Sequence, residues 1–386
     1  MRRMVRYLLL IGSFAAVPSV ALRVCFATGP PAFPVGAIQP KGNAESSSAE
    51  LLQQSQSTVN DGSGPVKQIA DERLKVTTGR GSGVLSLYVS LDWSKSQPRV
   101  ERAIIVFHGG ARNAEDYRDS VKRAIESTGR STNTILIAPR FLEEQDLTAF
   151  PFLPTGQLLR WSSGAWEDGQ DALAPAPISS FEAIDAILKI LGNKHLFPNL
   201  RLVVLAGHSG GGQTLQRYAV VGRGEELLRK VGVHVRYVVA NPSSYVYFND
   251  ERPTSDGRFA PYKASSCAAF NRWKYGVVNS PPYVANRSFR EMEDRYVSRD
   301  VIYLLGTADT TAALGMDQSC AAEAEGPFRY DRGINYFHYL ASRHPGNFKQ
   351  RLWYVPGVGH DQHKMFNSSC GLSALSDFGI CATKGK

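Results

Sequence analysis

The chain has 386 residues, of which 43% are hydrophobic and 20% are charged, and its formal net charge is +9 at pH 7. This composition is ordinary for a globular protein, so the chain can bury a sizeable core. Four of the arginines lie in the first 27 residues, which leaves a charge of about +5 on the remainder, with no basic run. Proteins that bind nucleic acids usually concentrate positive charge in one stripe, so we expect no nucleic-acid partner.

The N-terminus has the features of an export signal. Three arginines within the first six residues precede an apolar run from Leu8 to Leu22, and small residues suited to cleavage follow as far as Ala27. We predict a signal peptide over residues 1–27, a secreted or periplasmic protein and no membrane span after cleavage; an N-terminal membrane anchor is the alternative. Residues 28–68 are rich in Pro, Gly, Ser, Gln and Asn, which predicts a flexible linker before a folded domain over residues 69–386.

Strands and helices alternate from about residue 70 onward. An antiparallel strand is expected over residues 83–89. Continuous apolar runs predict strands buried on both faces, and these cover residues 102–107, 134–139, 202–206, 236–240, 301–305 and 352–355. Helical patterns lie between them. One runs through residue 191 after the capping-box segment 179–182, and the others cover residues 211–221 and 332–343. This alternation predicts an α/β fold with a mostly parallel, twisted sheet flanked by helices.

The segment 249–299 interrupts this alternation. It lacks clear periodicity and contains four prolines and many aromatic residues, Phe270 and Trp273 among them. A long loop without a core of its own is often functional. We therefore expect an irregular cap over the carboxyl edge of the sheet.

Four cysteines lie beyond the predicted signal peptide, and an even number in an exported chain predicts two disulfides. They are Cys267, Cys320, Cys370 and Cys381. Of the three possible connectivities we favour Cys370–Cys381 as a local bridge and Cys267–Cys320 as a longer one, although the sequence alone leaves this open. The spacing is unlike that of a metal site, so we expect no metal.

The strongest local signal is Gly207-His208-Ser209-Gly210-Gly211, which follows a buried strand and opens a helix. A serine hydroxyl is a poor nucleophile unless it is exposed and next to a base. A sharp turn from strand to helix lifts the side chain clear of the sheet, and flanking glycines allow the turn to close. Ser209 is therefore the candidate nucleophile; a merely structural glycine-rich turn is the alternative.

A second turn, His108-Gly109-Gly110-Ala111, follows the strand at 102–107. Acyl transfer creates an oxyanion that two backbone N–H groups usually stabilise. We expect one from Gly210 and the other from Gly110 or Ala111. His108 is interpreted as a histidine that stabilises the turn rather than as a base.

The acid and the base are expected after the last two strands. Asp309 ends the turn after the strand at 301–305, and His360 ends a Gly-x-Gly-His turn after the strand at 352–355. Asp317 and Asp331 compete for the role of the acid, and His363 for that of the base. We favour Asp309 and His360 because each stands where a strand of the sheet ends.

Together the segments 108–110, 207–211, 306–309 and 357–360 resemble the α/β-hydrolase superfamily, over roughly residues 75–370. The chain is similar to exported esterases and lipases and distantly similar to polyester depolymerases, although Ala111 stands where lipases have a third glycine. The resemblance implies a Ser-His-Asp hydrolase that cleaves small-molecule or polymeric esters without a cofactor. A serine peptidase on the same fold and a catalytically inactive binding protein are the alternatives. The oligomeric state is not indicated.

Overall fold

The computed structural model describes residues 64–285, 287–312 and 315–382. The predicted signal peptide and the first 36 residues of the predicted linker lie outside these ranges. Within them, no helix combines the length and the apolar character needed to cross a bilayer.

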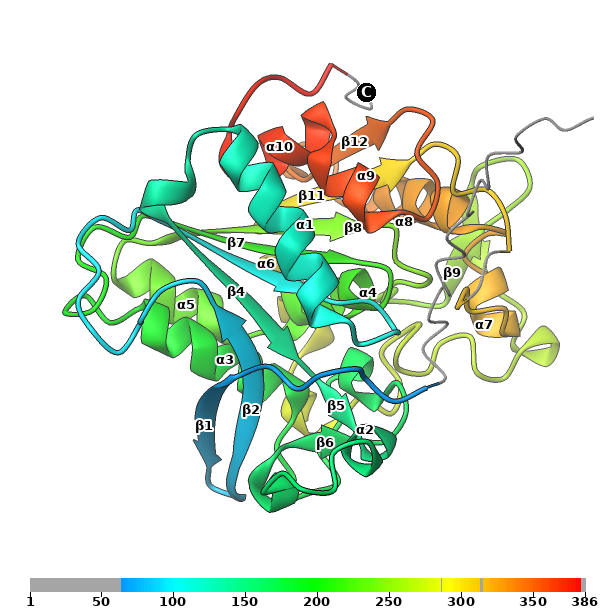
Figure 1. The fold of residues 1–386 in the computed structure, drawn as a ribbon. Coiled ribbons are helices and arrows are strands. Elements are labelled where there is room, and N and C mark those ends of the chain that lie inside the picture. Colours follow the sequence, from blue (N-terminus) through cyan, green and yellow to red (C-terminus); the bar gives the residue numbers. More distant parts are fainter. Residues whose placement is uncertain (1–63, 286, 313–314, 383–386) are drawn as a thin grey trace, which may run out of the picture. The chain divides into compact units, whose positions relative to one another are not determined.

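An eight-stranded sheet forms the centre of the fold (Figure 1), in the strand order β1-β2-β4-β3-β7-β8-β11-β12. β1 and β2 form an antiparallel hairpin, β2 also pairs antiparallel with β4, and the other neighbours are parallel. The strands are β1 (Glu72–Thr78), β2 (Gly81–Val89), β3 (Arg102–Phe107), β4 (Thr134–Arg140), β7 (Leu202–His208), β8 (His234–Ala240), β11 (Asp300–Gly306) and β12 (Arg351–Val355). The predicted mostly parallel α/β fold is confirmed.

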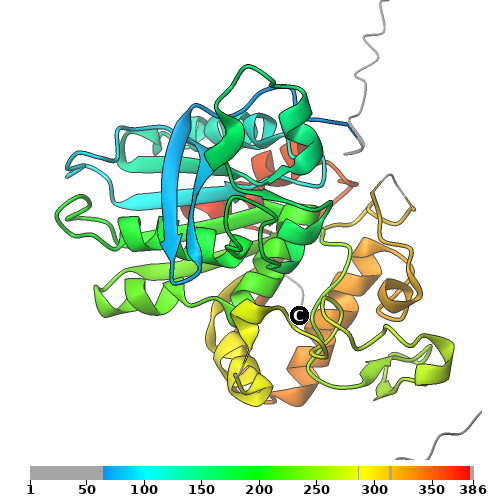
Figure 2. The same cartoon turned by 90° about the horizontal axis from the view of Figure 1, so that it is seen from below.

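Helices cover both faces of the sheet (Figures 1 and 2). One face carries α1 (Ala114–Ser127), α9 (Gln362–Asn367) and α10 (Ser369–Ser376). The other carries α3 (Ser180–Leu191), α4 (Gly210–Val221), α5 (Gly224–Lys230), α6 (Phe289–Ser298) and α8 (Arg329–Arg343). The predicted capping box is present at α3, where Ser179 Oγ accepts the Phe181 N–H at 3.1 Å and Glu182 Oε2 accepts the Ser179 N–H at 2.8 Å.

The central strands are apolar without alternation because both of their faces are covered. All six residues of β3 are buried. Ile105 packs into the cluster under α3, α4 and α8, whereas its neighbour Ile104 packs into the cluster under α1, α9 and α10. Successive side chains of a strand point to opposite faces, so each apolar run supports two cores.

The domain begins earlier than expected. Residues 64–68 were assigned to the flexible linker, but Val66 is buried against Leu142 and Leu158. Its N–H also donates to Asp146 Oδ1 at 2.9 Å. A lone apolar residue in a polar stretch gives no periodic signal, which is why the boundary at residue 69 is too late.

The segment 249–299 is more regular than predicted. Residues Phe289–Ser298 form α6, whose buried face packs in the main core, and β9 (Glu251–Pro253) pairs with β10 (Phe259–Pro261). Phe270 is buried against Tyr262, Cys267 and Ala321, in a small cluster of its own. Phe270 therefore packs within this segment and against the chain that follows β11.

Two pairs of cysteines lie at disulfide distance. Cys267 joins Cys320 at the start of α7 (Cys320–Glu323), and Cys370 joins Cys381. This is the pairing favoured from the sequence. The first bridge ties the segment after β10 to the chain that follows β11, and the second ties α10 to the C-terminal residues.

Candidate active site

Ser209 stands on a strained turn between β7 and α4. Its φ of 59° and ψ of −125° lie in a region that residues with a side chain rarely adopt, so the surrounding structure must hold this conformation. A Cβ at Gly207 would collide with the carbonyl oxygen of Gly211, and a Cβ at Gly211 would collide with that of Phe107. Only glycine fits at these two positions, which explains the glycine-rich motif.

The structure brings Ser209, His360 and Asp309 together, and we refer to them as the triad. His360 Nε2 lies 2.9 Å from Ser209 Oγ, and His360 Nδ1 lies 2.8 Å from Asp309 Oδ2. The loops that carry the acid and the base are bonded to each other, because the Ala308 N–H donates to Val358 O at 3.0 Å. This geometry allows His360 to accept a proton from the serine hydroxyl.

An arginine that the sequence analysis did not single out lies beside the acid. Arg329, at the start of α8, places Nη1 3.7 Å from Asp309 Oδ1, and both side chains are at most 1% exposed. Its Nε donates to Ser243 Oγ at 2.8 Å. Burial lowers the pKa of His360 below its ordinary value of 6.5, and the charge of Arg329 acts in the same direction, against the hydrogen bond to Asp309. The imidazole is thereby kept neutral at neutral pH.

Three backbone N–H groups are expected at the oxyanion hole. Within the described residues, those of Gly110, Ala111 and Gly210 have no hydrogen-bond acceptor. The Gly110 nitrogen is 3.0 Å from the position that a Cβ of Gly210 would occupy, so these two residues stand side by side. The Ser209 N–H is unavailable because it donates to Ala240 O at 3.1 Å. Gly110 and Gly210 thus offer two neighbouring donors to a negative oxygen.

A carboxyl group that the sequence analysis missed faces the same place. Glu167 lies in the short 3-10 turn Ala165–Asp168, and a Cβ at Gly210 would collide with its Oε1. Its Oε2 accepts from Gln213 Nε2, in the first turns of α4, at 2.7 Å. Burial raises the pKa of Glu167 to about 7. No pattern in the sequence marks this residue, because the turn that carries it is irregular.

The competing acids and bases lie elsewhere in the fold. Asp317 accepts the Tyr275 hydroxyl at 2.6 Å, and Asp331 lies in the first turn of α8. His363 is exposed, with Nδ1 3.2 Å from Ser120 Oγ on α1. His108 is fully buried, its Nε2 accepts the N–H of residue 141 at 3.0 Å, and burial lowers its pKa to about 3. None of the four bonds to Ser209.

Two tryptophans near the site belong to the core rather than to a binding surface. Trp161 and Trp166 are fully buried and pack on the ring of Phe141, with centroids 5.5 and 5.4 Å away. Trp273, from the expected cap, is only partly buried, and its indole N–H donates to Asp168 O at 2.7 Å. The segment after β10 therefore reaches the turn that carries Glu167.

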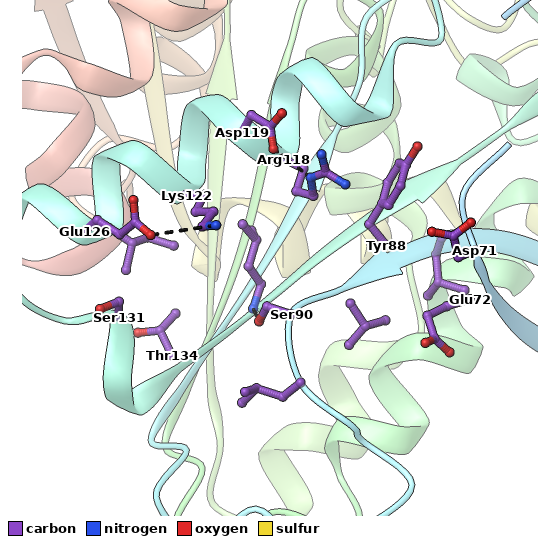
Figure 3. A pocket seen from close by; sticks show the side chains of 15 residues that line it. Asp71, Glu72, Tyr88, Ser90, Arg118, Asp119, Lys122, Glu126, Ser131 and Thr134 are labelled. Atoms are coloured by element: carbon purple, nitrogen blue, oxygen red, sulfur yellow. Dashed lines mark hydrogen bonds and ion pairs between the residues drawn. The ribbon is translucent and has the colours of Figure 1, made fainter. Parts of the chain in front are cut away.

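A separate hollow of about 490 Å³ lies between β2, β4 and α1 (Figure 3). Its lining carries both signs of charge, with Lys122 3.9 Å from Glu126 and the Arg118 guanidinium 4.4 Å from the centre of the Tyr88 ring. The triad does not line it, so we assign it no part in the chemistry. Elsewhere in the described ranges, no group of three or more His, Cys, Asp or Glu side chains is arranged to hold a metal ion.

The parallel sheet, the strained turn after β7 and the loops after β11 and β12 define the α/β-hydrolase fold, and this chain adopts it. Solved structures that share it include poly(aspartic acid) hydrolase-1 from Sphingomonas sp. KT-1, with a TM-score of 0.54, and a poly(3-hydroxybutyrate) depolymerase from Bordetella parapertussis, with a TM-score of 0.53. Each is 19% identical and covers 80% of this chain, and the matches span 99% and 91% of those chains. No protein-family model and no curated protein sequence matches the chain. At this identity the likeness concerns the fold.

Proposed function

We propose that the protein is an exported serine hydrolase that cleaves carboxylic esters, with Ser209 as nucleophile, His360 as base and Asp309 as acid. The observation that carries the proposal is the pair of short contacts of His360, 2.9 Å to Ser209 Oγ and 2.8 Å to Asp309 Oδ2. The neutral imidazole and the strained turn support it as well, since an exposed hydroxyl next to a base is what acyl transfer needs.

The reaction would run in two halves. His360 Nε2 takes the hydroxyl proton while Ser209 Oγ attacks the acyl carbon, and the oxyanion is held by the N–H groups of Gly110 and Gly210. The protonated imidazole then gives its proton to the leaving alcohol, which leaves an acyl-enzyme. Water, deprotonated by His360, attacks the acyl carbon, and collapse of the second intermediate releases the acid and Ser209. Asp309 holds the imidazole in one tautomer throughout.

The substrate would be a small-molecule or polymeric ester. The name of one structural neighbour describes a depolymerase of a polyester, which favours an ester, whereas that of the other describes a hydrolase of poly(aspartic acid). The second name keeps a peptidase or amidase activity as the alternative. Export is supported by the two cysteine pairs at disulfide distance, because disulfides persist in oxidising compartments.

The test compares wild-type protein with Ser209→Ala. We expect wild type to react with a fluorophosphonate probe and to hydrolyse a short-chain p-nitrophenyl ester faster than a peptide anilide. Ser209→Ala should lose the label and about 10⁴-fold or more of kcat, with an unchanged melting temperature. A wild-type protein that neither reacts with the probe nor turns over any ester would contradict the proposal and favour the inactive binding protein. A preference for the anilide would favour the peptidase.

A further inference from the structure

Glu167 occupies a position next to the oxyanion hole that the mechanism above does not use. Its Oε1 lies directly over Gly210, where a Cβ would collide with it, and the Gly110 nitrogen approaches the same point to 3.0 Å. Its Oε1 accepts no hydrogen bond from the described residues, whereas its Oε2 accepts from Gln213 Nε2 at 2.7 Å. One carboxyl oxygen is thus held by the protein, and the other faces the site where the substrate oxyanion would form.

The charges around this carboxyl do not neutralise it. The groups that act on it are Lys274, Arg217, Asp168 and Glu143. The two cations already have carboxylate partners, because Arg217 Nη1 lies 3.0 Å from Asp168 Oδ1 and Lys274 Nζ lies 3.5 Å from Asp317 Oδ2. Among the residues that the structure describes, Glu167 therefore has no ion pair of its own. A desolvated carboxyl without a cation is more stable in its neutral form.

The hydrogen bonds of Gln213 determine where the proton of a neutral Glu167 must be. Gln213 Oε1 accepts from Arg217 Nη2 at 3.1 Å and from Ser244 Oγ at 2.9 Å, so the amide nitrogen must be the group that faces Glu167. That nitrogen can only donate, so Glu167 Oε2 must accept. The carbonyl oxygen of a neutral carboxyl is a stronger acceptor than its hydroxyl oxygen, so this bond favours the proton on the other oxygen. The proton is left on Oε1, the oxygen that faces the hole.

We propose that Glu167 acts as a carboxylic acid whose Oε1–H is a third donor to the oxyanion, beside the N–H groups of Gly110 and Gly210. The inference rests on the proposed acyl transfer at Ser209. The proton stays on Glu167 throughout, since the group donates a hydrogen bond and does not transfer the proton. Ionised Glu167 would instead place a negative charge beside the developing oxyanion, which slows the attack.

The pH dependence follows from this role. Burial raises the pKa of Glu167 to about 7, with Lys274 and Arg217 opposing the shift. As the pH rises through this value the acid ionises, so kcat/KM for a neutral ester should fall, by about tenfold or more between pH 7 and 9. Because the pKa of His360 is lowered below 6.5, its ascending limb lies on the acid side, and the profile should be bell-shaped.

The decisive variant is Glu167→Gln. Gln213 orients the new amide so that its oxygen replaces Oε2 and its NH₂ group replaces Oε1–H, which makes it a donor that cannot ionise. We expect the descending limb to disappear, with kcat/KM at pH 9 within about threefold of the wild-type value at its maximum. Glu167→Met neither donates nor ionises, so its kcat/KM should not decrease at high pH. Its kcat/KM should be about 100- to 1,000-fold lower than the wild-type maximum, the usual effect of losing one oxyanion donor.

Glu144→Gln is the matched control, because Glu144 is exposed and pairs with Arg160 at 2.6 Å, away from the triad. It should keep the wild-type profile. A descending limb that persists in Glu167→Gln, or a Glu167→Met variant as active as Glu167→Gln, would overturn the inference. Neither outcome touches the proposed function, which is tested by wild-type turnover and its loss in Ser209→Ala. Circular dichroism at each pH separates loss of activity from unfolding.

Discussion

Replacing Arg329 with methionine should shift the ascending, acid limb of the kcat/KM profile to higher pH. The guanidinium lies 3.7 Å from Asp309 Oδ1, and His360 bonds to the other oxygen, Oδ2, at 2.8 Å. In the wild type this buried positive charge opposes protonation of His360, so it lowers the pKa of the imidazole. Without it only burial opposes the carboxylate of Asp309, and the imidazolium is stabilised at a higher pH.

The size of the shift follows from the geometry. The Arg329 guanidinium and the protonated imidazole of His360 stand on opposite oxygens of the Asp309 carboxylate, roughly 7 Å apart. At an effective dielectric constant of about 20, Coulomb's law gives a repulsion between these two cations of roughly 2.4 kcal/mol. This corresponds to an upper limit of about 1.7 pH units. The side chain of His360 is 17% exposed, so solvent weakens the interaction, and we expect about one unit.

The assay is kcat/KM from pH 4.5 to 8 on one soluble neutral ester, for wild type, Arg329→Met and Arg329→Lys. The lysine variant keeps the charge and should keep the limb within about 0.3 units of wild type. Breaking a buried ion pair costs about 3–5 kcal/mol, so the methionine variant should also unfold at a lower temperature. If folded Arg329→Met kept the wild-type limb, the charge of Arg329 would have no effect on the base, and the reasoning would be wrong.

Two further outcomes are expected from the segments around the site. Replacing both Cys370 and Cys381 with alanine opens a bridge between positions 11 residues apart and should lower the free energy of unfolding by about 2–3 kcal/mol, read by urea denaturation with activity unchanged at 25 °C. Trp273→Phe removes the bond to Asp168 O and should change the ranking of ester chain lengths more than the rate of labelling by a small probe. Phe270→Leu, in its separate cluster, should lower only the melting temperature, and a change of ranking there instead would contradict a cap that acts through Trp273.

The positions of Ser209, Asp309 and His360 could be predicted because each follows a strand whose apolar run is visible in the sequence. Parallel strands end at a common edge of the sheet, so residues far apart in the chain are expected to meet there. The glycines around Ser209 are visible for the same reason, since the tight turn leaves no room for other residues. The fold class and the triad candidates can thus be inferred from the hydrophobic periodicity and from the residues of the turns.

Arg329 and Glu167 could not be predicted in this way. Arg329 lies just before the helix expected at residues 332–343, and Glu167 stands in a short 3-10 turn, Ala165–Asp168, in the irregular chain that precedes α3. Their burial results from long-range packing, which periodicity does not report. The pKa of His360 depends on the same kind of contacts, and only the structure shows that burial outweighs the acid.

Arg329 and Glu167 together determine the pH range in which the triad can work. The base must be neutral, which requires a pH above the lowered pKa of His360, and the donor at the oxyanion hole must be protonated, which requires a pH below about 7 for Glu167. Both conditions hold only between the two values. If the charge of Arg329 were absent, the pKa of His360 would rise toward that of Glu167. The pH range of activity would then become narrower, because its acid end would move to higher pH. A neutral acid beside Gly210 is therefore compatible with catalysis near neutral pH because burial, together with the buried cation beside Asp309, keeps the base deprotonated.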